Sequence, residues 1–476
     1  MRNVEAAVIG SGPGGAMTAT LLAEAGREVV LLERGKNLRL SSCPPYSLQE
    51  MQQKYHCRGM TAAFGKPRVA YVEGCCVGGG SEINAGLYHR LPEEILEGWR
   101  RDFNVQDIDA SRLERIYALN ERDIQVNFMP AQMLPLASLK LHEGAKSLAW
   151  KSVEVPRGFV YGEDGRQFKQ SMTETFIPRA LNAGTVLKAE VRVDTLRRAG
   201  DEWIVLGRYM GGPGERYEAG DLELRAKHVF LCGGAIATPH LLQKSGLSTL
   251  AGRGLCMHPT VKMVARFPDQ INAIDMGIPV HQVKEFAPRL SLGCSISTPP
   301  YLQLSMIDVP GGSKIVRSHW QHMAIYYAMS RSGHGRVDRV PGCNDPLVRF
   351  DLGQDGIRDC LDGLFLLGQC LFEAGAVEVF PAVQGAVPIR SMRDLRLFLG
   401  GLRGSHLNLM TIHLFSSCPM GEMPSRCVAD SHGLVHGQKN LYINDASLLC
   451  SSLGVNPQGA LMMVARRNCE HFLASQ

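Results

Sequence analysis

The first residues whose types and spacing could do chemistry form a glycine-rich turn near the N-terminus. Gly10, Gly12 and Gly15 fit the spacing G-x-G-x-x-G, between an apolar run at residues 4–9 and a segment of helix formers at residues 16–25. In such a strand–turn–helix unit the first glycine permits the turn, and the second lets the backbone approach a pyrophosphate. The third lets the helix pack on the strand, and the helix N-terminus faces the anion. The turn therefore predicts a bound dinucleotide.

A carboxylate follows at the distance along the chain that ribose recognition requires. Glu33 ends a second apolar run, residues 28–32, and lies 23 residues after Gly10. It can accept hydrogen bonds from a ribose diol and would repel a 2′-phosphate, although the neighbouring Arg34 leaves NADP open. The turn and the carboxylate together do not distinguish FAD from NAD.

A second glycine-rich stretch is "VEGCCVGGGSEINAGLYHR", residues 72–90. Three consecutive glycines, residues 78–80, run into Ser81 and Asn84. Such a run allows unusual backbone angles and lets a large flat ligand lie against main-chain N–H groups. A flexible turn is the alternative interpretation of this stretch alone.

The C-terminal region brings a strand end and a helix start together. The segment "LYIND" predicts a strand that ends at Asp445, and residues 454–457, "GVNP", open the helix that follows. Open α/β sheets bind ligands where the carboxyl end of a strand meets the N-terminus of a helix. We therefore expect this segment to complete the site that the two glycine-rich turns begin.

These motifs need elements to position them, and the pattern along the chain indicates two kinds. Residues 228–246 again predict a strand, a Gly-Gly turn and a helix, which begins near Thr238 and Pro239. Between residues 267 and 353, short strand-like runs separated by Gly/Pro turns favour an antiparallel sheet, and a helical segment at 356–376 follows. The fold class expected is α/β with an inserted α+β substrate domain.

Composition narrows the function further. The chain has 476 residues, enough for two domains, and its net charge is only +5 without a block of lysines and arginines, so nucleic-acid binding has no support. No apolar stretch approaches the roughly 20 residues that a membrane helix needs. The first strand begins almost at the initiator methionine, which leaves no room for a secretory signal, so a cytoplasmic location is expected. The 14 cysteines are scattered, which predicts small buried hydrophobic residues and no metal site.

Four stretches in order along the chain resemble the glucose–methanol–choline (GMC) family of FAD-dependent oxidoreductases. They are the opening turn, "VGGGSEIN", "GGAIATPHLLQKSG", and the closing block "HLFSSCPMG" with "NLYINDASLLCSSLGVNP". The resemblance implies FAD rather than NAD, and oxidation of an alcohol carbon by hydride transfer to flavin N5. It also implies a Rossmann-like FAD-binding domain at 1–90, 155–266 and 408–476, and a substrate-binding domain and cap at 91–154 and 267–407.

The family's active-site pair falls on His413 and Asn456, where other members have a second histidine in place of the asparagine. A neutral imidazole can accept the hydroxyl proton near its ordinary pKa of about 6.5, and an asparagine can hold the oxygen by hydrogen bonds. The expected roles are therefore base for His413 and orienting group for Asn456. Of the other histidines, His406 is the one most easily mistaken for the base, whereas His258 and His436 are expected to be ordinary polar residues.

The resemblance also supplies the expected cofactor contacts. The predicted cofactor-binding residues are Gly10, Gly12, Gly14, Gly15, Glu33, Gly79, Gly80, Ser81, Asn84, Val191, Asp445, Ala446, Asn456 and Pro457. Members that bind flavin covalently carry a histidine directly before the asparagine of the second glycine-rich stretch. Here Ile83 takes that place, so noncovalent FAD is expected. Ser416 and Ser417 replace the usual Gly-Thr of the closing block, a change that slightly loosens the motif.

The substrate is less constrained than the chemistry. The stretch at residues 77–92 resembles enzymes that act on sugar-like or aminocyclitol alcohols, such as aminoglycoside-biosynthesis dehydrogenases. The expected electron acceptor is oxygen or another carrier. Asp308, Asp345 and Glu378 are candidate carboxylates for an amine-bearing substrate. Sterol or long-chain alcohol oxidation, a non-catalytic flavin-binding or electron-transfer protein, and a lyase or decarboxylase of the same fold remain alternatives.

Overall fold

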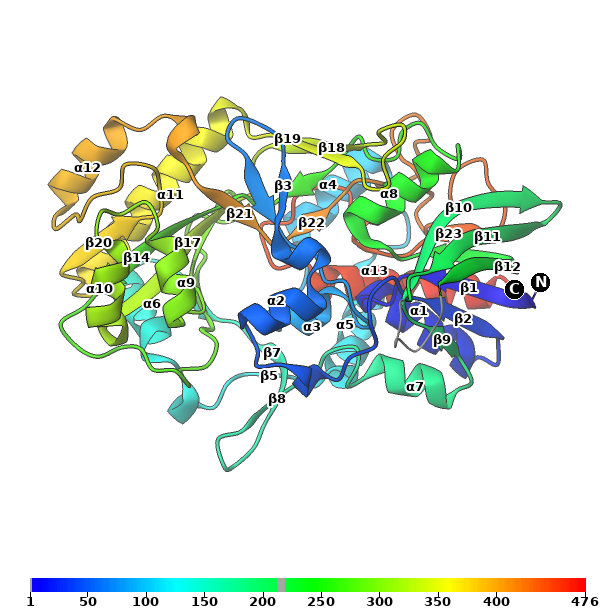
Figure 1. Ribbon diagram of the computed structural model, residues 1–476, viewed down its shortest axis with the longest axis horizontal. Helices are drawn as coiled ribbons and strands as arrows, with labels where there is room; N and C mark the ends of the chain where they lie inside the picture. The colour runs from blue at the N-terminus through cyan, green and yellow to red at the C-terminus, as the bar shows by residue number, and fades with distance from the viewer. Residues whose placement is uncertain (1, 212–218) are drawn as a thin grey trace.

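The computed structural model describes residues 2–211 and 219–476, and Figure 1 shows two sheets side by side, with both termini beside the smaller one. The smaller sheet has seven strands in the order β10-β11-β12-β1-β2-β9, with β23 paired to β12. The glycine-rich turn leaves this sheet at the carboxyl end of β1. Its strands are β1 Arg2–Ile9, β2 Val29–Leu32, β9 Val186–Lys188, β10 Val191–Ala199, β11 Glu202–Tyr209, β12 Gly220–Leu231 and β23 Leu441–Ile443.

The central strands of this sheet are parallel, as expected for a nucleotide-binding unit. β1 pairs in parallel with β2 and β12, β2 with β9, and β12 with β23, whereas β10 and β11 extend the other edge as an antiparallel hairpin. β2 is buried throughout, which follows from its run of Val and Leu. Helices α1 Pro13–Glu24, α7 Phe176–Asn182 and α13 Gln458–Ala474 pack together beside it (Figure 1).

Helix α8, Gly234–Lys244, begins earlier than the sequence predicts. We expected its start near Thr238 and Pro239, but Pro239 lies inside the helix. A proline cannot donate to the carbonyl four residues before it, which here belongs to Ala235. The hydroxyl of Ser417 donates to that carbonyl instead, at 2.6 Å, so a distant loop satisfies the acceptor that the proline leaves free.

The larger sheet has nine strands in the order β3-β4-β21-β14-β17-β16-β15-β6, with β20 paired to β14. Its central strands β14 to β17 are antiparallel, which, with the parallel sheet, confirms the predicted fold class. The strands are β3 Thr61–Ala63, β4 Val69–Tyr71, β6 Ser152–Glu154, β14 Thr260–Arg266, β15 His281–Val283, β16 Leu290–Cys294, β17 Met323–Ser330, β20 Glu378–Pro381 and β21 Leu409–Thr411.

One face of this sheet is apolar and covered by helices. Val261, Met263 and Leu292 on this face have no exposed surface, and helices α6 Leu136–Ser147 and α11 Gly353–Glu373 pack against the sheet. A Cβ atom at Gly363 of α11 would lie 2.7 Å from the Cβ of Ala328, so the helix approaches the sheet closely there. The opposite face is turned toward the other half of the molecule.

The sheets cross the expected domain boundaries at three points. β14, β21 and the hairpin β3–β4 belong to the antiparallel sheet, although residues 1–90, 155–266 and 408–476 were assigned to the nucleotide-binding domain. Apolar strand segments carry the same local pattern in either sheet, so pairing partners decide the assignment. The division into domains by residue number stays a prediction.

The remaining elements connect or cover the two sheets. Strands β13 and β22 form a short ribbon between the sheets, and β18 pairs with β19. These elements are α2 Leu48–Lys54, α3 Gly80–Ile83, α4 Glu93–Phe103, α5 Ala110–Asp123, α9 Pro299–Ser305, α10 Gly312–His319, α12 Met392–Gly400, β5 Val126–Asn127, β7 Arg157–Tyr161, β8 Gln167–Lys169, β13 Cys256–Met257, β18 His334–Asp338, β19 Leu347–Asp351 and β22 Leu414–Phe415, with 3₁₀ turns Leu40–Ser42, His56–Gly59, Ala131–Met133, Trp320–His322, Gly404–His406 and Ala446–Leu448.

None of the helices in the described part of the chain has the length and apolar character needed to cross a lipid bilayer. The 14 cysteines are free thiols, and Cys57 and Cys343 are the two that lie exposed.

Candidate active site

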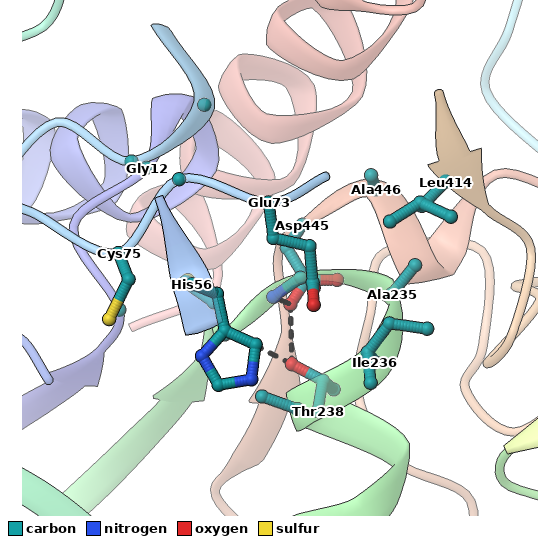
Figure 2. Close-up of a pocket in the computed structure, with 18 of the residues that line it drawn as sticks. Gly12, His56, Glu73, Cys75, Ala235, Ile236, Thr238, Leu414, Asp445 and Ala446 are labelled. Atoms are coloured by element: carbon teal, nitrogen blue, oxygen red, sulfur yellow. Dashed lines mark hydrogen bonds between the residues drawn. The ribbon is translucent and has the colours of Figure 1, made fainter. Parts of the chain in front are cut away.

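A long cavity runs from the glycine-rich turn of the parallel sheet to the loop that carries His413. Figure 2 shows its central part, with Gly12 on one side and Ala235, Ile236 and Leu414 on the other. Every predicted cofactor-binding residue except Gly15 lines this cavity, and so does His413. His56 and Glu73, which the sequence analysis did not single out, also line it.

The glycines of the first turn divide into two roles. A Cβ atom at Gly12 would have nothing within 4 Å, so this glycine faces open space where a pyrophosphate would lie. At Gly14 a Cβ would lie 2.0 Å from the carbonyl oxygen of Asn444, and at Gly15 1.8 Å from that of Gly10. These two glycines allow strand and helix to approach. The turn fits a dinucleotide, with Gly12 as the open position.

Glu33 is buried at the base of this turn. Its Oε2 accepts hydrogen bonds from the backbone N–H and the hydroxyl of Ser11, at 3.0 and 2.6 Å, and its Oε1 accepts one from the N–H of Gly35 at 2.7 Å. Burial raises the pKa of Glu33, while these bonds oppose the shift. The carboxylate thus holds the turn in place and also lines the cavity where a ribose is expected.

Asp445 joins the C-terminal strand to helix α8. Its Oδ2 accepts from the N–H of Gly234 at 2.8 Å and from the hydroxyl of Thr238, and its Oδ1 accepts from the N–H of Ser447 at 2.8 Å. Figure 2 shows the contact between Asp445 and Thr238 in the cavity wall. The side chain of Asp445 therefore fixes three segments around the cofactor space, and a ligand would meet the backbone of this junction.

His413 and His258 occupy matching positions on two strands. In the ribbon of β13 and β22, Cys256 is opposite Phe415 and Met257 is opposite Leu414. The next positions in this antiparallel register are His258 and His413, and their Nδ1 atoms lie 3.0 Å apart. His258 has no exposed surface and His413 is 9% exposed. His258, expected to be an ordinary polar residue, is therefore a direct partner of His413.

The hydrogen bonds of His258 determine where the hydrogens of a neutral pair lie. The N–H of Gly454 donates to Nε2 of His258 at 3.0 Å, so that nitrogen keeps its lone pair. The hydrogen of a neutral His258 then sits on Nδ1 and is donated to Nδ1 of His413. A neutral His413 then carries its own hydrogen on Nε2, and the atom 3.3 Å away is Nδ2 of Asn456, which is also a donor, so this contact is a hydrogen bond only in the other tautomer or with the amide of Asn456 turned over.

Asn456 connects the histidine pair to the polar face of the larger sheet. It lies two residues before helix α13, and its amide oxygen is 3.2 Å from Nε2 of Gln282 on β15. The same Gln282 nitrogen is 3.1 Å from the hydroxyl of Tyr327 on β17. The oxygen of Gln282 is buried without a partner. The pair His413–Asn456 thus lies where the cofactor cavity meets the second sheet.

Burial keeps His413 neutral. Desolvation, together with the positive charge of Lys284, lowers the pKa of His413 to about 3, and desolvation lowers that of His89 to about 3 as well. The pKa of His258 also lies well below its usual value, because of burial and repulsion from His413. The pKa of His413 therefore lies below the ordinary value near 6.5 that was expected from the sequence.

The other residues considered from the sequence lie away from His413 and Asn456, although Asp345 lines the cavity. Nδ1 of His406 accepts from the N–H of Arg403, and His436 contacts the carbonyl of Gly421 at 3.0 Å. Of the three candidate carboxylates, Asp308 accepts a hydrogen bond from Asn408, Asp345 pairs with Arg34, and Glu378 pairs with Arg266 and Arg390. None of the three contacts His413 or Asn456 among the described residues.

A cluster of two histidines and one aspartate lies outside this site, and its side chains are of types that can bind a metal ion. Asp107, His432 and His471 place one potential ligand atom each within 4.8 Å of the others. The two imidazole rings are stacked at 3.5 Å with an angle of 7° between their planes. Ring nitrogens donate their lone pairs in the ring plane, so two parallel stacked rings do not direct both lone pairs at one ion.

The backbone conformation of Ser416 is one that suits glycine. Its φ is +67°, in the left-handed region that residues other than glycine rarely adopt. The serine is buried, and its hydroxyl oxygen has no hydrogen-bond partner. Ser416 in place of glycine thus adds backbone strain, while Ser417 in place of threonine keeps a hydroxyl that donates to helix α8.

The chain is similar to known proteins in sequence and in fold. Two family models, both described as GMC oxidoreductase, match residues 13–260 and 402–465. The chain is 35% identical to an uncharacterized GMC-type oxidoreductase of Sinorhizobium fredii, over 99% of this chain and 94% of that protein. It is 24% identical to a long-chain-alcohol oxidase of Arabidopsis thaliana, over 97% of this chain and 67% of that protein. Its fold is similar to the crystal structure of pyridoxine 4-oxidase from Mesorbium loti, with a TM-score of 0.74, 16% identity and 99% of each chain covered.

Proposed function

The chain belongs to the GMC oxidoreductase family of FAD-dependent enzymes, and from this premise we propose that it oxidises the CH–OH group of a small, sugar-like alcohol. That it is an alcohol-oxidising flavoenzyme follows from the family; the polar substrate class is the proposal. The observation that supports it is the contact of Asn456 with Gln282 and, beyond it, Tyr327. A wall of amide and phenol groups next to the reacting carbon suits a substrate with several hydroxyl groups.

FAD, when bound, supplies the two-electron acceptor and takes the hydride at N5. The residues that would hold it are the backbone of the turn at Gly12, Glu33 at the ribose end and the junction at Asp445. Ile83, at the position where covalent attachment would need a histidine, lines the cavity. Noncovalent attachment stays a prediction.

His413 and Asn456 would hold the hydroxyl oxygen of the substrate. In the resting tautomer, Nε2–H of His413 donates a hydrogen bond to that oxygen and would stabilise the negative charge that develops there as the hydroxyl proton leaves. The hydroxyl proton would then pass to a base of the solvent, because Nε2 has no lone pair in this tautomer. The base role expected for His413 requires a lone pair on Nε2. Nδ2 of Asn456 can donate to such a lone pair, whereas the hydrogen bond from Gly454 favours the opposite arrangement.

Long-chain alcohol oxidation is the second candidate function. Its support is the similarity to the Arabidopsis thaliana oxidase, at 24% identity and over 67% of that protein. Against it stand the polar groups that contact Asn456, since an alkyl chain would leave their hydrogen bonds unsatisfied.

Anaerobic bleaching of the flavin tests the proposal. The holoenzyme would be mixed with myo-inositol, glucose, glucosamine, cholesterol and 1-dodecanol in turn, and the visible flavin absorbance followed. We expect one of the polar alcohols to bleach the flavin faster than dodecanol or cholesterol does. Faster bleaching by dodecanol or cholesterol would overturn the substrate class. A flavin that no alcohol reduces would favour a non-catalytic flavin-binding protein.

A further inference from the structure

A second cavity lies behind the part of the second glycine-rich stretch that faces the cofactor cavity. Residues 37–46, the hairpin of β7 and β8, and helix α7 line this second cavity. Residues 83–87 line the cofactor cavity. Figure 1 shows the hairpin next to α2 and α3. Side chains from the lining of the second cavity donate hydrogen bonds to the backbone of residues 82–85, so this backbone separates the two cavities.

Lys169, at the end of β8, makes the shortest of these contacts. Its Nζ donates to the carbonyl oxygen of Glu82 at 3.0 Å and to that of Asn84 at 2.6 Å. The hydroxyl of Tyr46 donates to the same carbonyl of Asn84 at 3.2 Å. Burial lowers the pKa of Lys169 to about 8, so the ammonium is still charged at neutral pH. A charged donor makes a stronger hydrogen bond than a neutral one.

Arg157 approaches the same backbone from the same face of the hairpin. Its Nε donates to the carbonyl oxygen of Ala85 at 3.1 Å, and its guanidinium carbon lies 3.5 Å from the centre of the Phe159 ring. Lys169 is opposite Phe159 in the ladder, and residues that are opposite, or two apart along a strand, point to one face. Arg157 has no exposed surface. The hairpin therefore holds two cations against this backbone.

The peptide unit between Asn84 and Ala85 has one side occupied and one side free. A trans peptide unit is planar, and its C=O and N–H point in opposite directions. Because the carbonyl of Asn84 points to Lys169, the N–H of Ala85 points away from Lys169. Ala85 lines the cofactor cavity, and within the part of the chain that the structure describes no acceptor bonds this N–H. The next N–H, of Gly86, already donates to Oδ1 of Asn84 at 3.0 Å.

The free N–H lies at the end of the cavity where the alcohol would react. Nδ2 of Asn84 donates to Oε1 of Gln458 at 2.5 Å, and Gln458 follows Asn456 by two residues. Hydride transfer requires the flavin ring to lie beside the alcohol, and so at this end. A backbone N–H that a ligand covers needs an acceptor from that ligand.

We infer that Lys169 is a positioning residue for the cofactor, which holds the peptide unit of Asn84 and Ala85 so that the N–H of Ala85 donates a hydrogen bond to the flavin ring. The inference rests on the proposed function for the presence of FAD in this cavity. A donor directed at the ring stabilises reduced FAD, which carries more negative charge, more than oxidised FAD. Lys169 thus raises the midpoint potential of the bound flavin.

The midpoint potential tests the inference without an alcohol. It would be measured by dye-coupled reduction of the holoenzyme, and the Kd of oxidised FAD by titration of the apoprotein. In Lys169→Met, reduced FAD should bind at least about tenfold more weakly relative to oxidised FAD than in the wild type, which lowers the potential by about 30 mV for two electrons. If Lys169→Met weakens both forms equally and keeps the wild-type potential, Lys169 has only a structural role and the inference is overturned.

Two further variants alter the donors to the carbonyl of Asn84. Lys169→Arg keeps a charged donor and should restore most of the potential. Tyr46→Phe removes the second donor and should lower the potential by a smaller amount than Lys169→Met does. This variant decides the question if Lys169→Met fails to fold, because an unchanged potential in Tyr46→Phe would then contradict the inference.

Two controls separate peptide orientation from charge. Arg166→Met, at the exposed tip of the same hairpin, should keep the wild-type potential. Lys54→Met removes a buried ammonium that donates to the carbonyl of Leu40 at 2.9 Å, in the lining of the second cavity. If Lys54→Met lowers the potential as much as Lys169→Met does, charge alone sets the potential and the inference is wrong.

NMR of ¹⁵N-alanine-labelled protein observes the donor itself. The resonance of Ala85 would be assigned by its loss in Ala85→Gly. We expect FAD to move the amide proton of Ala85 downfield in the wild type, and to move it less in Lys169→Met. A resonance that FAD leaves in place would overturn the inference.

These measurements are independent of the test of the proposed function. Bleaching of the wild type by an alcohol tests alcohol oxidation, whereas the potential and the amide shift are measured with FAD alone. If no alcohol bleaches a bound flavin, the proposed function fails and the role of Lys169 is still decided by the potential. If an alcohol bleaches the flavin and Lys169→Met keeps the wild-type potential, alcohol oxidation stands and the inference falls.

Discussion

The candidate active site has two walls, one at the parallel sheet and one at the antiparallel sheet, and they expose different groups of the chain. The wall at the parallel sheet is backbone: the turn at Gly12, the second glycine-rich stretch and the junction around Asp445. The wall at the antiparallel sheet is made of side chains, with Gln282 and Tyr327 in contact on one face. In the proposed function the backbone wall would bind the cofactor, which is constant, whereas the side chains of the other wall can change with the substrate and leave the fold intact. The two walls should therefore respond differently to substitution.

The largest effect is expected at Gly12. It has φ −62°, which a larger residue can adopt, and nothing lies near its Cβ position, so Gly12→Val should fold. Its side chain would occupy the space of the pyrophosphate, and FAD affinity should fall at least about a hundredfold, about 3 kcal/mol. Flavin content and a titration of apoprotein with FAD measure this loss.

Two other glycines provide the controls for that substitution. Gly98→Val, at an open position in helix α4, should keep its flavin. Gly14→Val should fail to fold, because its Cβ would lie 2.0 Å from a backbone carbonyl. Full flavin occupancy in Gly12→Val would mean that this turn does not bind the cofactor.

The buried histidines should make stability fall in acid. Native His413 stays neutral down to a pKa of about 3, whereas in the unfolded chain it binds a proton near its ordinary pKa of about 6.5. The unfolded state therefore gains protons first, and the free energy of unfolding decreases as pH drops below about 6.5 and until it passes about 3. Between pH 7 and 5.5, His413 alone should account for about 1 kcal/mol of this loss.

Chemical denaturation at the two pH values measures it. His413→Gln lacks this titration, so its stability should fall by about 1 kcal/mol less than that of the wild type over the same range. An equal loss in both proteins would show that His413 is not held neutral in the folded state.

His258 should act as a positioning residue for His413. Long-range ¹⁵N NMR of histidine-labelled protein distinguishes the two tautomers of an imidazole. We expect His413 to carry its hydrogen on Nε2 in the wild type, because Gly454 donates to His258. In His258→Phe that constraint is lost, and hydrogen on Nδ1 of His413 should become detectable, with flavin reduction slowed about tenfold.

A matched variant separates tautomer control from packing. His258→Gln offers both an acceptor for Gly454 and a donor for His413, so it should lie closer to the wild type than His258→Phe does. Hydrogen on Nδ1 of His413 in the wild type would contradict the donor role and support the base role.

The smallest effect is expected at Ser416. Its positive φ strains a side chain that makes no hydrogen bond, so Ser416→Gly should raise the free energy of unfolding by up to about 1 kcal/mol. Thermal unfolding would show a rise of a few degrees at most. A lower melting temperature would mean that contacts of the serine outweigh the strain.

The backbone wall could be predicted from sequence, and the side-chain wall could not. Glycine spacing, a carboxylate after the second strand and a strand end before a helix are local signals, so the positions around Gly12, Glu33 and Asp445 were recognised. Tyr327 and Gln282 are far apart along the chain and meet only through the register of three antiparallel strands, β17, β16 and β15. A single sequence contains no signal for that register beyond alternation, which apolar strands share.

His258 and Pro239 show two further limits. His258 faces His413 because two short strands, each two residues long, pair in one particular register. Pro239 was placed at a helix start because proline suits the first turn, but a serine from a distant loop bonds the carbonyl that proline leaves free. In both cases a tertiary contact overrides a sound local expectation.

The central claim is that His413 handles the hydroxyl group of an alcohol while the backbone wall holds the cofactor. The most direct test is anaerobic single-turnover flavin reduction, with the alcohol that bleaches the wild type fastest. His413→Ala should keep its FAD and reduce it at least about a hundredfold more slowly, a loss of about 3 kcal/mol in transition-state stabilisation. His436→Ala, which loses only a contact to the carbonyl of Gly421, should match the wild type. Reduction of His413→Ala at the wild-type rate would contradict the account.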